Sequence, residues 1–346
     1  MAERPCRGLQ NLLDRFNSGS GLHFRNITLS QLLEFEKSVV SLEKQLSDLR
    51  ASAQLNDINV ASVISKLQEK IDKLLKQIYN KLTPWDIVQV ARLPERPKFL
   101  DYLNGFCSNF IELSGDRLFG DDRAIIGGFA TIDDQKVIII GQEKGQDTES
   151  RIEHNFGMPM PEGYRKVLRL LDIADRFNLP VINIIDTSGA YPGLESEERG
   201  QAESIARCIE KSFSVKSPMI SIIIGEGGSG GAVAMATTDY VLMLEYSIYS
   251  VISPEGCASI LWKDDSKAPI AASIQHITAK QLYDLKVIDE IIKEPLGGAH
   301  RNKQLAIESV KNAILQYLNK SKLITIKERI KNRRNKFQTM GNDYLI

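Results

Sequence analysis

Two stretches near the N-terminus carry apolar residues at the spacing of an amphipathic helix. In the first, amid Glu and Lys, these residues are Leu32, Leu33, Phe35, Val39, Leu42, Leu46 and Leu49. The second runs from about Val60 to Leu82 and repeats the pattern after a polar connection at 52–59. Together they predict an antiparallel helical hairpin. Such a hairpin does not bury its apolar stripe alone, so we expect it to cover the main body or a partner chain.

From about residue 127 the pattern changes to short apolar runs that alternate with helical ones. Strands are predicted on both sides of the turn Asp133-Asp134 and at 180–186, 218–226, 239–245 and 247–253. Helices are predicted at 159–178, 195–213, 230–238 and 253–262. This alternation is typical of an α/β fold. The basic run at 327–336 predicts a solvated terminal helix.

Four of these strands end in a turn of small residues, in the segments 137–145, 182–193, 221–231 and 249–256. The carboxyl ends of parallel strands lie at one edge of a sheet, and ligands bind there. We therefore expect the turns to converge on a binding site. The turn at 225–231, GEGGSGG, has the most glycine and is the main candidate.

One use of this turn is to hold a dinucleotide. Gly225, Gly227 and Gly230 match G-x-G-x-x-G, and Glu245 follows Gly225 by 20 residues, where an acid would bind the ribose. However, the predicted helix at 230–238 is short for the crossover of such a unit. A P-loop is excluded because no Lys-Ser or Lys-Thr follows the glycines.

A second use of the turn is an oxyanion hole. Adjacent backbone N–H groups at a helix N-terminus stabilise developing negative charge, and glycine lets a planar carbonyl approach them. This chemistry suits thioester enolates and the transfer of acyl or carboxyl groups. The GSG at 228–230 is interpreted as a turn and not as a nucleophile elbow, and the sequence has only four His, so a Ser-His-Asp nucleophile is not expected.

The amino-acid composition argues against several classes of protein. The 346 residues contain 44 Lys and Arg and 44 Asp and Glu, so no net charge favours binding to nucleic acid or to an anionic membrane. The four cysteines form no C-x-x-C pair, so no metal site is expected in this chain. No apolar run is long enough to span a membrane, and no secretory signal is visible. A cytoplasmic protein is predicted.

Longer motifs then carry a resemblance to a known family. They are NFGMPMPEGYRK (155–166), DTSGAYPG (186–193), EERGQAESIA (197–206), IGEGGSGGA (224–232), YSVISPEGCASILWK (249–263) and EPLGGAHRN (294–302). With these motifs the chain closely resembles the alpha subunit of the carboxyltransferase component of bacterial acetyl-CoA carboxylase. The resemblance runs from about Leu32 to Phe337, which is nearly the whole chain.

The resemblance implies a crotonase-like fold, a superhelix of ββα units with an N-terminal helical hairpin. We expect four parts: an irregular extension at 1–28 that exceeds the family pattern, a helical arm at 29–95, a carboxyltransferase domain at 96–325 and a basic tail at 326–346. The implied reaction transfers a carboxyl group from carboxybiotin to acetyl-CoA and forms malonyl-CoA, the first committed step of fatty acid biosynthesis.

The resemblance also implies partners. The chain would be active only with a homologous beta subunit, in an alpha2beta2 heterotetramer, and the beta subunit would carry the zinc. Carboxybiotin would arrive on the biotin carboxyl carrier protein, and a separate biotin carboxylase would use ATP. No membrane or nucleic acid partner is expected.

The same resemblance assigns the candidate residues. Gly230 and Gly231 match the pair whose N–H groups would stabilise negative charge on the ureido oxygen of biotin. Gly189 and Ala190 would line the carboxybiotin pocket. Ser188 replaces the proline that the family has at this position, which we expect to loosen the turn and to keep its backbone donors.

Several charged residues have alternative assignments from the sequence. We expect Glu226 to accept hydrogen bonds from nearby backbone N–H groups. Arg165, Lys166 and Arg199 are candidates for contacts with the phosphates of coenzyme A, with surface charges of a helix as the alternative. His300 and Arg301 lie in a glycine-rich turn, where they would either bind a ligand or stabilise the loop.

Two other functions remain open at this point. One is a nicotinamide-dependent dehydrogenase built on Gly225, Gly227, Gly230 and Glu245. The other is a scaffold without catalytic activity that uses the helical hairpin to assemble other chains.

Overall fold

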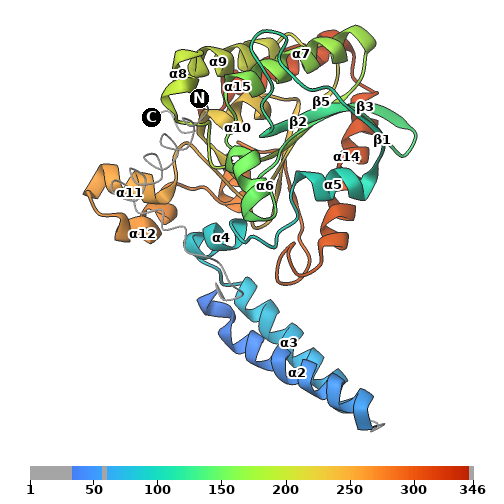
Figure 1. Cartoon of the computed structure of the whole chain (residues 1–346), viewed down its shortest axis with the longest axis vertical. Helices are drawn as coiled ribbons and strands as arrows, with labels where there is room; N and C mark the ends of the chain where they lie inside the picture. Colours follow the sequence, from blue (N-terminus) through green and yellow to red (C-terminus); the bar gives the residue numbers. More distant parts are fainter. Residues whose placement is uncertain (1–32, 57–60, 343–346) are drawn as a thin grey trace, which may run out of the picture.

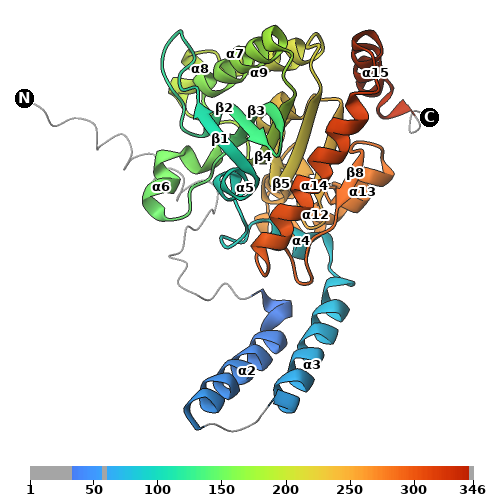
Figure 2. The same ribbon diagram turned by 90° about the vertical axis from the view of Figure 1, so that its right-hand side faces the viewer.

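The computed structural model describes residues 33–56 and 61–342. The predicted extension at 1–28 lies outside these residues, as do parts of the connection within the hairpin. The described chain forms a compact α/β body from which a long two-helix arm projects (Figures 1 and 2).

The arm is the predicted helical hairpin, which is confirmed. A short 3-10 turn, η1 (Glu34–Glu36), leads into α2 (Lys37–Asn56), and α3 (Ala61–Tyr79) returns antiparallel to it. The apolar stripes of the two helices face each other, and their buried members are Val39, Leu46, Ile71, Leu75 and Tyr79. The stripes therefore cover one another along the arm, and the body covers only its base.

The body is built on a mixed sheet of eight strands. Their order is β1-β2-β3-β4-β5-β6-β8, and β7 pairs with the end of β5. The strands are β1 (Cys107–Glu112), β2 (Ile125–Ile132), β3 (Gln135–Gln142), β4 (Val181–Thr187), β5 (Met219–Gly228), β6 (Tyr240–Leu244), β7 (Ile248–Ser250) and β8 (Glu290–Ile292). The first three pair antiparallel and the rest parallel.

Helices cover both faces of this sheet. On one face α5 (Phe99–Phe106) and α14 (Lys303–Ser321) pack against alternate strand residues such as Ile182 and Ile184. On the other, α7 (Pro161–Phe177) and α9 (Gln201–Ser212) pack against Val181 and Ile185. A strand buried on both faces needs the continuous apolar runs seen in the sequence.

The remaining helices connect the strands and border the sheet. They are α4 (Pro84–Ala91), α6 (Thr148–Glu153), α8 (Leu194–Glu198), α10 (Ser229–Ala236), α11 (Pro254–Trp262), α12 (Ala268–Ile274), α13 (Ala279–Asp284) and α15 (Ile326–Thr339), with short 3-10 turns η2 (Asn155–Gly157) and η3 (Asp265–Lys267).

Two expectations about helices are corrected. The single helix predicted at 195–213 is divided into α8 and α9, because Gly200 takes a left-handed conformation with φ of 81°. The predicted terminal helix, α15, is not simply solvated. Arg333 is fully buried, and its guanidinium donates to the carbonyls of Ser212 (2.5 Å) and Val215 (2.7 Å) and pairs with Asp239 (2.8 Å).

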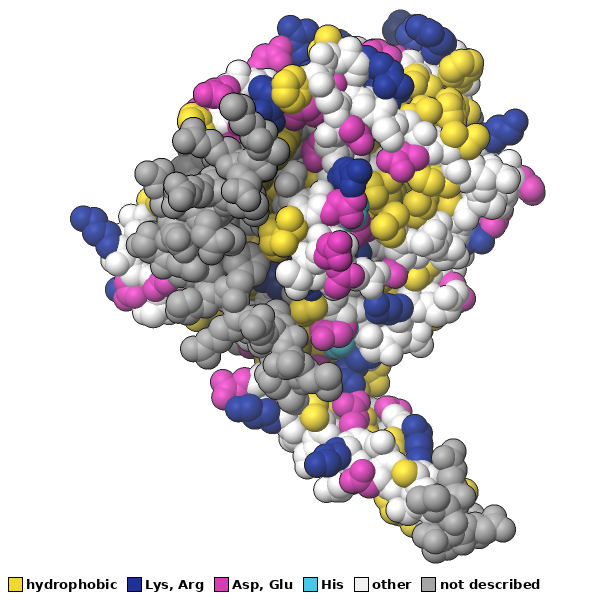
Figure 3. All heavy atoms as spheres, in the orientation of Figure 1, with side chains coloured by type: hydrophobic (Ala, Val, Ile, Leu, Met, Phe, Trp, Pro, Cys, Tyr) yellow, Lys and Arg dark blue, Asp and Glu magenta, His cyan; other side chains and the backbone are white. Residues whose placement is uncertain are grey.

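The surface agrees with the balanced composition. Figure 3 shows Lys and Arg side chains interspersed with Asp and Glu over the visible face of the body and the arm. Within the described parts of the chain, no helix combines the length and the apolar content that crossing a bilayer requires.

Candidate functional site

The glycine turn lies where β5 ends and α10 begins. Gly228 is the residue before the helix, and Ser229, Gly230 and Gly231 form its first turn. The N–H groups of the first turn of an α-helix have no acceptors within the helix, and the helix dipole adds partial positive charge there. Gly230 and Gly231 therefore present two neighbouring backbone donors at the carboxyl edge of the sheet.

The turn that follows β4 lies directly against these glycines. A Cβ on Gly231 would lie 2.8 Å from the N of Ala190 and from the C of Gly189. A Cβ on Gly228 would lie 2.1 Å from the carbonyl oxygen of Ser188. Both positions therefore require glycine. The structure brings Gly231, Gly189 and Ala190 together, as sequence reasoning predicted from converging strand ends.

The predicted glycines differ in the contacts that they make. The N–H of Gly189 donates to Thr187 Oγ1 (3.0 Å), so this donor is used within its own turn. A Cβ on Gly230 would meet only the side chain of Ile205, at 3.5 Å. Gly230 thus borders α9, whereas Gly231 borders the 189–190 turn.

Gln142, at the end of β3, fixes the spacing of these segments. Its Nε2 donates to the carbonyl oxygen of Gly231 (3.0 Å), and its Oε1 accepts from the N–H of Asp186 (3.2 Å). The side chain is fully buried. One amide therefore ties α10 to the end of β4.

A partly buried cluster of charges supports the turn. Glu226 pairs with Arg92, the residue directly after α4 (2.7 Å), and with Lys144 (2.9 Å), and Lys144 also pairs with Asp186 (2.8 Å). Arg92 pairs in addition with Glu255 in the first turn of α11 (2.6 Å). The expectation that the Glu226 side chain accepts from backbone N–H groups is thus wrong. Its own N–H donates to Asp186 (2.9 Å).

The cluster holds Glu226 and Lys144 in their charged forms. Burial by itself raises the pKa of Glu226, but Lys144 and Arg92 outweigh it and hold that pKa well below its ordinary value. Burial likewise opposes the charged form of Lys144, yet Asp186 and Glu226 raise its pKa above the usual range. The groups under the glycine turn are therefore a fixed electrostatic support and not a source of protons near neutral pH.

Backbone strain accompanies the site. Ser229, the first residue of α10, has φ of 51°, and Phe156 has φ of 55°. Positive φ is unfavourable for side chains with a Cβ and persists where the surroundings impose it, often at functional sites. The neighbouring Gly157 packs on the same cluster, because a Cβ there would lie 2.6 Å from Lys144 Cγ and 3.0 Å from the Asp186 carbonyl oxygen.

The three basic residues considered for coenzyme A phosphates are engaged in other contacts. Lys166 is fully buried and donates to the carbonyls of Asp122 (2.8 Å) and Ile125 (2.7 Å). Arg165 and Arg199 both pair with Glu162, at 3.0 Å and 2.6 Å. These cations hold the segments around the first turn of α7 together, so neither the phosphate contacts nor free surface charges describe them.

Arg301 stabilises the base of the helical arm. Its guanidinium pairs with Glu36 (2.7 Å) and Glu43 (2.5 Å) at the base of the arm. Burial, together with Arg96 and Arg301, lowers the pKa of His300 to about 3, which keeps this imidazole neutral.

No group of three or more His, Cys, Asp or Glu within 33–56 and 61–342 is arranged to hold a metal ion.

The geometry does not support the dinucleotide alternative. Glu245, the acid that would bind a ribose, pairs with Lys293 (2.6 Å), and its second oxygen accepts from the N–H of Glu294 (3.3 Å). The helix after the glycines, α10, has only eight residues. Glu245 is thus part of the packing between the end of β6 and the segment after β8.

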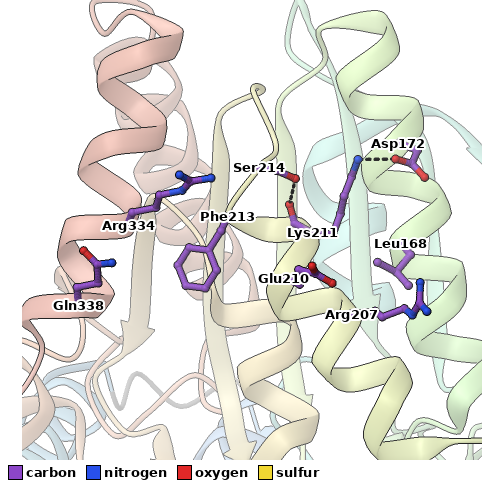
Figure 4. Close-up of a pocket in the computed structure, with 9 residues that line it drawn as sticks. All are labelled: Leu168, Asp172, Arg207, Glu210, Lys211, Phe213, Ser214, Arg334 and Gln338. Atoms are coloured by element: carbon purple, nitrogen blue, oxygen red, sulfur yellow. Dashed lines mark hydrogen bonds and ion pairs between the residues drawn. The ribbon is translucent and has the colours of Figure 1, made fainter.

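A concave surface lies away from the glycine turn, between α7, α9 and α15 (Figure 4). It has a volume of about 810 Å³ and is lined by Leu168, Asp172, Arg207, Glu210, Lys211, Phe213, Ser214, Arg334 and Gln338. Lys211 points to Asp172 and pairs with it (2.5 Å). The pocket shares no residue with the glycine turn, and its lining offers no set of converging unpaired donors.

Sequence reasoning missed the residues that support the turn. Gln142, Lys144 and Asp186 all follow or end strands whose carboxyl ends were expected to converge, and this was the available signal. Nothing in the sequence pattern indicated Arg92, which lies 134 positions before its partner Glu226. Gly230 borders Ile205 and Gly231 borders Tyr164. The sequence pattern indicates only that these two neighbours are apolar positions of helices.

Comparison with known proteins identifies the chain's relatives. Residues 32–341 match the model of the family described as acetyl co-enzyme A carboxylase carboxyltransferase-like. The acetyl-coenzyme A carboxylase carboxyl transferase subunit alpha of Zymomonas mobilis is 56% identical over 286 residues, which are 83% of this chain and 91% of the relative. The subunit of the same name from Rhodospirillum centenum is 54% identical over 312 residues, 89% and 98% of the two chains.

Solved structures show the same fold at much lower identity. Transcarboxylase 12S, with methylmalonyl-coenzyme A bound, aligns with a TM-score of 0.50 and 16% identity, covering 64% of this chain and 44% of that one. A Pseudomonas malonate decarboxylase hetero-tetramer in complex with coenzyme A aligns with a TM-score of 0.51 and 13% identity, covering 64% and 90%. The predicted crotonase-like fold is thereby confirmed.

Proposed function

The chain belongs to the family of acetyl-CoA carboxylase carboxyltransferase alpha subunits, and on this premise we propose how its glycine turn takes part in carboxyl transfer. The N–H groups of Gly230 and Gly231 donate to the ureido oxygen of carboxybiotin. Negative charge develops on this oxygen as the carboxyl group leaves. Gly189 and Ala190 form the adjoining wall of the pocket. The dehydrogenase alternative is not supported, since these relatives are carboxyltransferase subunits.

The observation that best supports this proposal is the position of the backbone N–H groups of Gly230 and Gly231 in the first turn of α10. Gly231 admits no Cβ, because Ala190 and Gly189 lie against it, and Gln142 holds its carbonyl. Donors fixed in this way need no reorganisation as charge develops, and one such donor is commonly worth a factor of about 10²–10³ in rate. The paired charges of Glu226, Lys144 and Arg92 keep the turn rigid.

The bond changes in the reaction balance without an acid or base from this chain. The bond between the carboxyl carbon and N1 breaks, and its electron pair remains on the ureido group. That nitrogen takes the proton from the acetyl methyl group, whose carbon forms the new bond to the carboxyl carbon. A corresponding pair of donors on a beta-type subunit would stabilise the thioester enolate. The product is malonyl-CoA, for fatty acid biosynthesis.

The proposal also includes the partner proteins and the cellular location. A beta-type subunit, which would hold the zinc, completes the site in an alpha2beta2 assembly. Exposed apolar side chains on and next to α11 and α12 support the need for a partner; they are Val251, Ile260, Leu261, Ile270 and Ile274. Glu255 of α11 contacts the charge cluster through Arg92, so this face adjoins the site. The biotin carrier protein, an ATP-dependent biotin carboxylase and a cytoplasmic location complete the proposal.

The test is a malonyl-CoA decarboxylation assay with free biotin. We expect no turnover from the purified chain, activity when a beta-type subunit is added, and no binding of NADH. Activity from the single chain would contradict a shared site. Tight NADH binding would restore the dehydrogenase alternative. Unchanged activity of the assembled enzyme after bulky substitutions at Gly230 and Gly231 would leave a scaffold role for this chain.

A further inference from the structure

Three large apolar side chains are exposed on two segments near the glycine turn. Leu118 is 81% exposed and Phe119 is 70% exposed in the loop between β1 and β2, and Leu194, the first residue of α8, is 70% exposed. We call these three residues the apolar lip. Isolated exposed apolar residues are ordinary on protein surfaces, so the location and the rigidity of the lip decide whether it has a function.

Short contacts connect the lip to the candidate site. The guanidinium carbon of Arg199, which ends α8, lies 4.7 Å from the centre of the Phe119 ring. Two residues later, Gln201 donates to the carbonyl oxygen of Tyr191 (3.0 Å), which is the residue after Ala190. One helical turn further along α9, Ile205 borders Gly230. The lip therefore borders the segments that form one side of the proposed carboxybiotin pocket.

The loop that carries Leu118 and Phe119 is held rigidly. Asp116 Oδ1 accepts from the N–H groups of Leu118 (2.9 Å), Phe119 (2.9 Å) and Gly120 (3.0 Å). Its other oxygen pairs with Arg165 Nε (2.7 Å), whose Nη1 donates to the carbonyl of Arg199 (3.1 Å). Burial opposes ionisation of Asp116, but these partners lower its pKa to about 2. The lip is thus preorganised, which reduces the entropy lost on binding.

We propose that the apolar lip is the docking surface for the protein domain that carries the biotin. The proposal rests on the proposed function, in which the carboxyl donor enters the pocket between the 189–190 turn and α10 while attached to a carrier. The carrier must leave in every cycle, and three exposed side chains fit a small, transient contact with a few anchors. A permanent subunit needs a larger apolar area, and the five exposed residues around α11 and α12 provide more of it.

The experiment compares two carboxyl acceptors in the assembled alpha–beta enzyme. Malonyl-CoA decarboxylation is measured with free biotin and with the biotinylated carrier protein, for Leu118→Asp and, separately, Leu194→Asp. We expect the KM for the carrier to rise about tenfold or more, the loss typical of one interface anchor. The rate with free biotin should stay within about twofold, because neither side chain belongs to the pocket. Aspartate suits the first position of α8, so Leu194→Asp should fold.

The matched control is Leu323→Asp. Leu323 is 87% exposed in the connection between α14 and α15, which none of the contacts above link to the glycine turn, and its substitution should leave both reactions unchanged. An unchanged KM for the carrier in both lip variants overturns the proposal. So does an equal loss with free biotin and carrier, or a loss of alpha–beta association, which would assign the lip to the beta-type subunit. If the wild-type assembly fails to turn over free biotin, the proposed function fails instead.

Discussion

At the scale of single residues, the two central glycines have different surroundings. A methyl group on Gly230 would meet only Ile205, at the ordinary contact distance of 3.5 Å. The same group on Gly231 would overlap backbone atoms of Gly189 and Ala190, at 2.8 Å. Backbone atoms cannot move aside as a flexible side chain can, so the two substitutions should have unequal consequences.

We predict that Gly231→Ala lowers kcat of the assembled enzyme by about 10²–10³, because the clash displaces the Gly231 N–H and misplacing one fixed donor should cost about as much as losing it. The methyl group would push the 189–190 turn away from α10 and should also lower the free energy of unfolding by roughly 1–3 kcal/mol. The measurements are steady-state malonyl-CoA decarboxylation with free biotin and urea unfolding of the chain.

Gly230→Ala is the matched control for this prediction. Its φ is not positive, so alanine fits the helix and should raise the free energy of unfolding by up to about 1 kcal/mol. The methyl group displaces no backbone atoms, so the N–H stays in position and kcat should fall less than tenfold. Equal rates for the two variants would argue against a donor role for the turn at Gly231.

The charged residue Lys144 provides a prediction about pH. Removing its ammonium in Lys144→Met leaves Asp186 and Glu226 with one cation fewer, and we expect the pKa of Glu226 to rise above its unfolded value in the folded state. A raised carboxyl pKa means that the folded state holds protons which the unfolded state releases above about pH 4.5. Stability of the variant should therefore decline as pH rises, whereas the wild-type cluster retains its stabilisation above that pH.

Urea unfolding at pH 5 and pH 7.5 measures this effect. The difference between wild type and Lys144→Met should be larger at pH 7.5, where loss of a buried partner costs about 3–5 kcal/mol. Lys293→Met, which removes an exposed lysine paired with Glu245, should change stability by less than about 1 kcal/mol at either pH. A difference that is independent of pH would show that Lys144 acts through packing alone.

Residue by residue, the sequence could predict the glycine turn but not its support. Gly231 and Gly189 follow strands that a hydrophobic pattern reveals, so their meeting at one sheet edge was predictable. The partners of Glu226 were not, because Lys144 and Arg92 lie 82 and 134 positions away and no local pattern links them. Lys166 shows the same limit, since helical spacing did not indicate that its ammonium would be buried beside carbonyl groups.

At the scale of elements, two buried arginines, Arg329 and Arg333, fasten the C-terminal helix α15 to the body. Arg333 donates to the carbonyls of Ser212, Val215 and Ser217 and pairs with Asp239. Ser212 ends α9, Val215 and Ser217 lie between α9 and β5, and Asp239 comes directly before β6, so a single guanidinium joins three segments.

We predict that Arg333→Ala lowers the free energy of unfolding by about 3–5 kcal/mol, because it leaves a buried carboxylate and several carbonyls without their partner. Chemical denaturation measures the loss, and protease cleavage near α15 should accelerate. Arg334→Ala, at the exposed neighbouring position, should stay within about 0.5 kcal/mol of wild type. Similar losses for both variants would indicate that charge, not the buried contacts, matters.

Element boundaries show which sequence signals were sufficient. The hairpin of β2 and β3 and the helix α7 were predictable because period and turn residues agree. The division between α8 and α9 was not, because Glu- and Gln-rich sequence continues across Gly200, and only the left-handed backbone there reveals the break. The edge strand β1 lacks the apolar run of a buried strand, since four of its six residues are exposed.

At the scale of the whole molecule, the arm meets the body at a small base (Figure 2). Arg301 holds Glu36 and Glu43, and the hydroxyl of Tyr79 donates to Glu36 (2.5 Å). The rings of Tyr79 and Tyr246 pack edge to face at 5.1 Å between centres. Because the stripes of α2 and α3 cover each other, the direction of the arm depends on these few contacts.

We predict that Arg301→Ala leaves the arm folded but frees its direction. Two carboxylates lose their shared cation at the base, whereas the apolar contacts between α2 and α3 are untouched. Spin labels at an exposed position of α3 and on the body should give a broader distance distribution by pulsed electron paramagnetic resonance, with unchanged helicity by circular dichroism. Lys37→Ala, which removes an exposed pair with Glu34 at the same end of the arm, should leave the distribution as in the wild type. A narrow, unshifted distribution in Arg301→Ala would mean that the aromatic contacts of Tyr79 alone determine the direction of the arm.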